Sequence, residues 1–172
     1  MKLLAIRGRN LASLAEPFEI DLTAPPLVSA GLFAITGPTG AGKSTILDAL
    51  CLALFSRLPR LPGGVGTLLG REEDPADLRI ATTDVRGVLR RGAGSGWAEA
   101  EFAGRDGHRY LARWEVRRAR NRPGGRLQDV TQSLLRLDDR QPLGGTATET
   151  RAEIERLLGL SFDQFRRAVL LV

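Results

Sequence analysis

The sequence has a single cysteine, Cys51, and a single histidine, His108. One cysteine cannot close an internal disulfide, so the chain is not a disulfide-stapled secreted scaffold. We expect Cys51 to be a small core residue. The two residues lie far apart in the chain and cannot supply the ligands of an ordinary zinc site. His108 follows a glycine turn, where we expect it to be exposed, and it supports no Ser-His-Asp triad.

Long apolar runs are also missing. No segment approaches the roughly 18 uninterrupted apolar residues of a membrane span. The apolar run within residues 1–7 is too short for a signal peptide, because Arg7 already ends it. The sequence therefore predicts a cytoplasmic protein with no membrane partner. Hydrophobic residues make up 42% of the chain and charged residues 26%, which suits a folded core and argues against disorder. A length of 172 residues fits one domain or one piece of a larger one.

Lysine is scarce, since Lys2 and Lys43 are the only two, and arginine supplies nearly all of the positive charge. The net charge is +5 at pH 7. Between Arg86 and Arg126 there are eleven arginines and four acidic residues, 11 − 4 = +7, so the rest of the chain sums to −2. A local basic surface favours a polyanionic partner such as nucleic acid. The alternative is a solvated hairpin in an arginine-rich proteome.

The most informative motif is the glycine-rich run at residues 37–45, Gly-Pro-Thr-Gly-Ala-Gly-Lys-Ser-Thr. It fits the pattern G-x-x-x-x-G-K-S/T. The apolar run before it, 31–36, has the length of a buried strand, and residues 45–55 after it have helical composition. Strand, glycine loop and helix in this order are the context that a phosphate-binding loop requires. The run therefore predicts a nucleotide site.

The chemistry of such a loop follows from its geometry. Glycines let backbone N–H groups turn inward around a phosphate chain. A helix that opens at Lys43 points its positive end at the same place. We expect Lys43 to reach the β- and γ-phosphates of ATP and the Ser44 hydroxyl to ligate Mg²⁺. The predicted ATP-binding residues are Gly37, Pro38, Thr39, Gly40, Ala41, Gly42, Lys43, Ser44 and Thr45, with Ser44 as the metal ligand.

Composition divides the chain into four parts, which we expect to form one lobe over 1–172. These parts are strands, phosphate loop and first helix (1–58), a loop-rich insert (59–96), antiparallel hairpins (97–145) and helices (146–172). Alternating or apolar runs predict strands at 2–7, 18–22, 31–36, 97–102, 109–116 and 132–137, and a further strand beginning within 80–91. The order of strands, phosphate loop, antiparallel meander and helices differs from the regular alternation of a compact kinase.

The last part carries helix signals. Thr146 with Glu149, Thr150 with Glu153, and Ser161 with Gln164 are candidate capping boxes, in which each side chain reaches the backbone N–H of the other residue. In the final helix Phe162, Phe165 and Val169 are expected to share one face.

Hydrolysis needs more than a phosphate loop. An acidic residue at the end of a second buried strand must help to hold Mg²⁺, and another group must position the attacking water. The only apolar run that ends in acid is 134–139, closing on Asp138 and Asp139, and Arg136 interrupts it. Burying that guanidinium in a parallel sheet costs several kcal/mol unless it is paired. We therefore interpret the run as an exposed hairpin strand and assign no catalytic residue.

Three segments carry a family resemblance: residues 1–14 with 18–21, residues 31–55, and residues 160–171. Together with the basic stretch 110–120, they resemble the N-terminal part of the SbcC family. SbcC proteins are the ATPase subunits of SbcCD nucleases and belong to the ABC-type ATPases that include the SMC proteins. The resemblance spans nearly the whole chain. It implies an α/β P-loop NTPase fold of the ABC/SMC-like head type, specifically an N-terminal lobe with an antiparallel β meander that is incomplete without a C-terminal lobe.

The resemblance also implies partners. In this family the N- and C-terminal parts of one head fold together, and two heads form a homodimer that sandwiches two ATP molecules. The dimer gates an SbcD-like nuclease subunit that cuts double-stranded DNA ends and hairpins. The family's catalytic glutamine would follow about where the chain stops, at Val172, and the acidic magnesium strand is absent. We therefore expect poor ATP hydrolysis from the chain alone. Asn10 and Ser13 lie near where relatives approach the nucleotide base.

Two other functions remain open from the residues alone. The first is a stand-alone small P-loop kinase or NTPase, in which Asp138 or Asp139 would have to hold the metal. The second is a non-catalytic nucleic-acid-binding module that uses the basic surface 113–126.

Overall fold

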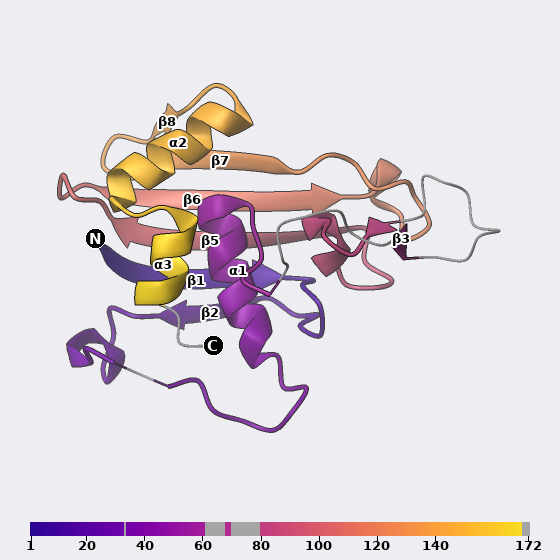
Figure 1. The fold of residues 1–172 in the computed structure, drawn as a ribbon, viewed down its shortest axis with the longest axis horizontal. Helices are drawn as coiled ribbons and strands as arrows, with labels where there is room; N and C mark the ends of the chain where they lie inside the picture. The colour runs from indigo at the N-terminus through magenta and orange to yellow at the C-terminus, as the bar shows by residue number, and fades with distance from the viewer. Residues whose placement is uncertain (33, 61–67, 70–79, 170–172) are drawn as a thin grey trace.

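The computed structural model describes residues 1–32, 34–60, 68–69 and 80–169 (Figure 1). Its main feature is a six-stranded antiparallel sheet in the order β2-β1-β5-β6-β7-β8. The strands are β1 (Lys2–Arg9), β2 (Phe18–Asp21), β5 (Ser95–Ala103), β6 (Arg109–Arg117), β7 (Thr131–Arg136) and β8 (Gln141–Leu143). A separate pair joins β3 (Leu68–Leu69) to β4 (Ile80–Ala81), and three 3-10 turns are η1 (Leu27–Ser29), η3 (Val85–Val88) and η4 (Ala119–Asn121).

Three α-helices lie on one side of the sheet: α1 (Lys43–Phe55), α2 (Ala147–Leu158) and α3 (Phe162–Ala168). In Figure 1, α1 crosses the middle of the sheet, α2 lies along β7, and α3 lies beside α1 in front of β1. Among the residues that the structure describes, none of these helices is long and apolar enough to cross a bilayer.

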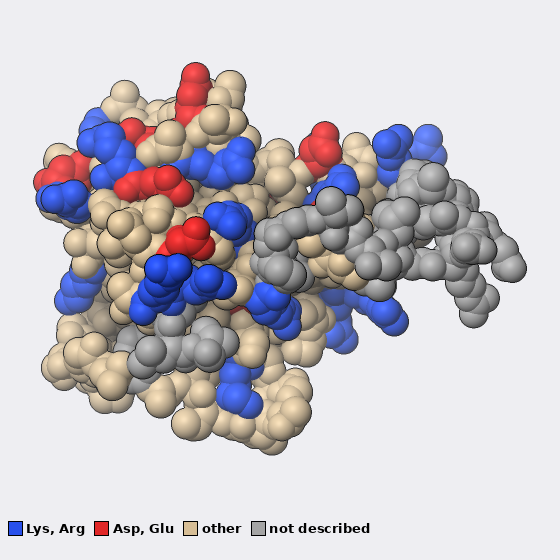
Figure 2. Space-filling model, viewed as in Figure 1, with Lys and Arg blue, Asp and Glu red and all other residues tan. Residues whose placement is uncertain are grey.

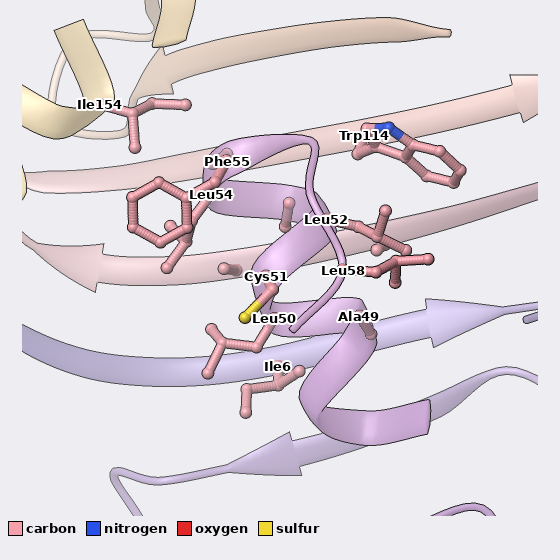
Figure 3. Packing of buried hydrophobic residues seen from close by; sticks show 14 of the residues in the cluster. Ile6, Ala49, Leu50, Cys51, Leu52, Leu54, Phe55, Leu58, Trp114 and Ile154 are labelled. Carbon is pink, nitrogen blue, oxygen red and sulfur yellow. The ribbon is translucent and has the colours of Figure 1, made fainter. Parts of the chain in front are cut away.

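Small residues bring α1 close to the sheet. Ala98, Ala100 and Ala112 alternate inward on β5 and β6 and are fully buried, so no large side chain separates helix from sheet. Most of α1 is itself apolar and buried, as a helix enclosed on several sides must be. Figure 3 shows Ile6 of β1 and Trp114 of β6 packed around the helix, which contributes Leu52 to the same cluster. Cys51 lies in this core, as predicted, and burial raises the pKa of its thiol to about 12, with the Asp48 carboxylate acting in the same direction.

The five strands predicted at 2–7, 18–22, 97–102, 109–116 and 132–137 are confirmed as β1, β2, β5, β6 and β7. β7 pairs antiparallel with both β6 and β8, and Arg136 at its end makes an ion pair of 2.6 Å with Asp139. The interpretation of this segment as an exposed hairpin strand is therefore correct. β8 was not predicted; it contains Pro142 and lies at the sheet edge, where a missing N–H costs no ladder hydrogen bond.

The prediction of a buried strand at 31–36 is wrong for the residues that the structure describes there. Residues 31–32 and 34–36 pair with no strand, and Leu32 is 83% exposed. A buried strand needs neighbours on its flanks, and these described residues pair with neither edge strand of the main sheet, β2 or β8. The segment instead passes from η1 to α1 outside the sheet (Figure 1).

The strand expected within 80–91 is reduced to β4, followed by the 3-10 turn η3. Asp84 explains the change, because its carboxylate caps η3 by accepting from the N–H of Arg86 at 2.9 Å. Much of the predicted loop-rich insert, residues 61–67 and 70–79, lies outside the described residues.

The helix signals at the C-terminal end are mostly confirmed. Thr146 and Glu149 form a capping box at the start of α2, and Ser161 and Gln164 form one at the start of α3. The third candidate is wrong, because Thr150 lies inside α2 and is buried. Phe162 and Phe165 pack on Phe55 of α1, with ring centroids 5.5 and 5.2 Å away. Val169 does not share their environment, since it ends the helix and is exposed.

Candidate functional site

The glycine loop has the backbone that its sequence requires. Gly40 and Gly42 have φ of +84° and +89°, in the left-handed region that favours glycine. Gly42 is the N-cap of α1, which begins at Lys43 as expected. The N–H groups of Lys43, Ser44 and Thr45 have no acceptor among the described residues, because the first backbone bond of the helix runs from Ile46 to Gly42. Unpaired donors at a helix N-terminus form an anion site when the loop before them curves around it.

Lys43 bends back over this loop. Its Nζ donates to the carbonyl oxygens of Gly37 at 2.7 Å and Pro38 at 2.9 Å. The ammonium group is thereby held above the loop, beside the free N–H groups of the helix. Ser44 is exposed at the first turn of α1, whereas Thr45 faces inward and is buried. The structure thus brings the predicted residues of 37–45 into one curved, electropositive segment.

The turn at residues 10–14 forms a wall beside the loop. A Cβ on Gly42 would lie 2.6 Å from Cδ2 of Leu14 and 3.3 Å from Oγ of Ser13, so the two segments are in direct contact. Ser13 is exposed at this contact. Asn10 points elsewhere, since its side-chain amide donates to the carbonyl oxygen of Ser95 at 2.8 Å. Of the two residues suspected near a nucleotide, the structure therefore brings only Ser13 to the loop.

Asp48 is a charged residue of this region that the sequence reasoning missed. It lies one helical turn after Ser44 and is 2% exposed. Arg60, from the segment that follows α1, places Nη2 at 2.5 Å from its carboxylate. Burial raises the pKa of Asp48, and the positive charge of Arg60 only partly opposes that shift. The sequence does contain a sign of this residue, because Asp48 is the one acidic residue within the apolar run 45–55.

The two candidate metal acids, Asp138 and Asp139, do not meet the loop. They lie in the turn between β7 and β8, at the upper left of Figure 1, whereas α1 begins below the sheet near the middle of the picture. Asp138 bonds Nδ1 of His108 at 2.6 Å, and the bond from Arg136 lowers the pKa of Asp139 to about 2. Within the described residues no cluster of three or more His, Cys, Asp or Glu side chains is arranged to hold a metal.

The basic region divides into two surfaces. On the outer face of the sheet, away from the helices, arginines are paired with acids. Arg7 bonds Glu19 and Glu101, and Arg113 bonds Glu99 and Glu115. Arg109 also pairs with Glu101. This face is therefore largely self-neutralised, which removes Arg113 from the basic surface 113–126 that the sequence predicts for nucleic-acid binding.

The second surface is at the end of the sheet where β6 leads into η4. Gly94 and Ser95 pair with Arg118 and Arg117, which brings the turn before β5 beside η4. Four arginines of the stretch 117–126 are exposed and form no ion pair with any described residue; we call them the terminal arginine group: Arg117, Arg120, Arg122 and Arg126. Figure 2 shows Lys and Arg side chains at this end, on the right.

Fold and loop together define a P-loop ATPase-like domain with a six-stranded antiparallel sheet. Comparison with known proteins gives the family. Residues 5–172 match the family described as AAA domain, and the chain belongs to it.

Individual relatives agree with this assignment. The chain is 53% identical over 171 residues to the SbcC subunit of the nuclease SbcCD from Rhodobacter capsulatus and 55% identical over 172 residues to that of Pseudomonas aeruginosa. Each match covers 99% of this chain but 14% of the relative. A DNA double-strand break repair Rad50 ATPase of Methanopyrus kandleri is 29% identical over 140 residues, 81% of this chain and 13% of that protein. The chain therefore spans about one seventh of the curated relatives that it matches.

Substituting Gly42 tests the contact between loop and wall. We expect Gly42→Ala to lower the free energy of unfolding by about 1–2 kcal/mol for the left-handed backbone, plus roughly 1–3 kcal/mol for overlap with Leu14. Gly40→Ala is the matched control, because Gly40 has a similar φ but nothing within 4 Å of its would-be Cβ. Urea denaturation of both variants measures the difference. Equal losses would show that the wall does not contact the loop.

Proposed function

We propose that this chain is the ATP-binding N-terminal lobe of an SbcC-like DNA-repair ATPase, whose complete head gates an SbcD-like nuclease. The observation that carries the proposal is the loop at the start of α1, where three free backbone N–H groups, the Lys43 ammonium and the positive helix end converge. Relatives named as a subunit of the nuclease SbcCD, and one named as a Rad50 ATPase, support the same assignment.

The residues present fit a magnesium nucleotide. A Cβ at Gly40 would meet nothing within 4 Å, so the loop is open at that position and leaves room for phosphate oxygens. Lys43 would exchange a carbonyl contact for the β- and γ-phosphates, and exposed Ser44 would ligate Mg²⁺. The bound metal would neutralise charge on those phosphates. Thr45 is buried behind the loop and would hold it from below rather than reach the metal through its side chain.

Hydrolysis would need groups from outside the described residues. Asp48 is the acid closest in sequence to Ser44, but it is buried and paired with Arg60. The segment 31–36 has the sequence of a buried strand, but Leu32 is exposed and residues 31–32 and 34–36 pair with no described strand. We propose that a C-terminal part of the same head supplies the neighbouring strand and the acidic residue, and that a second head closes over the nucleotide. A cytoplasmic location is part of this proposal.

The lysine substitution tests nucleotide binding directly. We expect Lys43→Ala to reduce ATP affinity at least about a hundredfold, because each charge-assisted bond to phosphate contributes roughly 1.5–3 kcal/mol. Isothermal titration calorimetry with MgATP measures it. Lys2→Ala is the matched control, since Lys2 is exposed on β1 and should leave affinity unchanged. Retained ATP affinity in Lys43→Ala would refute the proposed site.

The stand-alone NTPase makes a different prediction about Asp138 and Asp139. Because both carboxylates are engaged at the β7–β8 turn, we expect replacing them together with Asn to leave ATP turnover unchanged. We also expect turnover by the 172-residue chain to be slow. Steady-state phosphate release measures both. Fast turnover that the double substitution abolishes would support the independent enzyme instead.

A second candidate activity is double-stranded DNA binding by the terminal arginine group, which its unpaired guanidinium groups favour. We expect Arg117→Gln with Arg122→Gln to weaken DNA binding and to reduce the slope of log affinity against log salt by about 2. Fluorescence anisotropy over a salt series measures the slope. Arg109→Gln with Arg113→Gln is the control, since these arginines are already ion-paired. Equal slopes for both pairs would exclude the terminal group as the DNA surface, and Lys43→Ala should bind DNA normally.

A further inference from the structure

The turn at residues 10–14 adopts an unusual backbone. Asn10 and Ala12 have φ of +54° and +44°, which costs a residue with a side chain about 1–3 kcal/mol and persists only where surrounding contacts fix it. Leu11 and Leu14 bond to each other across the turn, N–H to carbonyl, at 3.0 and 2.8 Å. These internal bonds close the turn, but they do not fix its position against the rest of the molecule.

Three residues outside the turn fix that position: Val88 accepts from the N–H of Ala12 at 2.7 Å, Ser95 accepts from the Asn10 amide at 2.8 Å, and Arg90 makes the largest number of these bonds. Its backbone N–H donates to the carbonyl oxygen of Asn10 at 2.9 Å. Its guanidinium Nη1 donates to the carbonyl oxygens of Ser13 at 2.9 Å and Ala12 at 3.3 Å. No ion pair involves Arg90 within the part of the chain that the structure describes, so the protein contacts of its charged head are those with this turn.

The other side of the turn touches the phosphate loop. Leu14 and Ser13 lie against Gly42, at distances that would leave no room for a Cβ there. Gly42 immediately precedes Lys43, whose N–H is the first of the free donors at the helix end. Since close-packed segments transmit small displacements, a shift of the turn would move these donors.

We propose that Arg90 is a positioning residue for nucleotide binding. It holds the turn 10–14 against Gly42 and thereby keeps the phosphate loop in its binding geometry. The inference rests on the proposed ATP site, and it adds a residue 47 positions beyond Lys43 in sequence that touches neither phosphate nor metal. Because the turn touches the nucleotide site only at Gly42 of the phosphate loop, losing Arg90 should weaken binding of the phosphate chain rather than of the nucleoside.

The test compares two adjacent arginines. We expect Arg90→Gln to weaken MgATP affinity roughly tenfold. At metal sites, removing a residue that only supports the binding residues typically weakens affinity by about this factor or more. Arg91→Gln removes the same charge from an exposed residue outside these contacts, and its affinity should stay within about twofold of the unsubstituted protein. Arg90→Lys keeps one donor within reach of Ser13 and should fall between them. Calorimetry is done below the melting temperature of each variant, so that only folded protein is titrated.

Two further measurements separate positioning from a general structural role. Inorganic triphosphate should lose affinity by the same factor as MgATP in Arg90→Gln. In a Leu14→Ala background, which removes the closer of the two contacts to Gly42 and leaves that of Ser13, Arg90→Gln should cost less affinity than it does alone, so the double-mutant cycle shows coupling. Arg91→Gln should be additive with Leu14→Ala. If Arg90→Gln does not fold, Arg90→Lys and its cycle with Leu14→Ala decide the same question.

The outcomes are distinct. Equal affinities for Arg90→Gln and Arg91→Gln, with normal binding by the unsubstituted protein, would overturn this inference and leave the ATP site intact. Loss of MgATP affinity with unchanged triphosphate affinity would also overturn it, because the turn would then act on the nucleoside. Failure of the unsubstituted protein to bind MgATP would overturn the proposed function, and this inference with it.

Discussion

The packing of α1 on the alanine-lined face of the sheet is the contact on which the rest depends. Small side chains on β5 and β6 let the helix approach, and its apolar surface is buried as a result. Its N-terminus is thereby fixed at one edge of the core. The glycine loop is fixed there too, because it leads directly into the helix. Phe55 at the other end of α1 receives both phenylalanines of α3. One helix therefore joins the nucleotide loop to the C-terminal elements.

Whether an arginine of the meander is neutralised by an acidic residue depends on where it lies in the sheet. The same meander carries arginines that are cancelled by acids across the sheet face and arginines at its end that are not. Cross-strand pairing explains the difference, because residues such as Glu99 and Arg113 lie directly opposite each other in register. At the β6–η4 end Arg117 lies opposite Ser95, which carries no charge. A net charge counted along the sequence therefore overstates the surface that can attract a polyanion.

Much of the fold could be predicted from local patterns. Alternation predicted β5, β6 and β7, and capping residues predicted the starts of α2 and α3, because these signals act within a few residues. The prediction of a strand at 31–36 was wrong because a buried strand depends on neighbouring strands, and its own sequence carries no information about them. At the site, the motif predicted the loop, whereas the contacts of Arg90 and Asp48 with distant segments carry no local pattern. Long-range contacts of this kind appear only when the chain is folded.

Cys51 has a practical consequence. Its side chain is fully buried between α1 and its neighbours, and its thiol stays protonated at neutral pH because burial raises the pKa to about 12. A thiol in that state resists alkylation while the helix is seated, since thiolate is the reactive form. The single thiol is thus a built-in reporter: its modification rate records how often the central helix separates from the sheet, without any label being engineered into the protein.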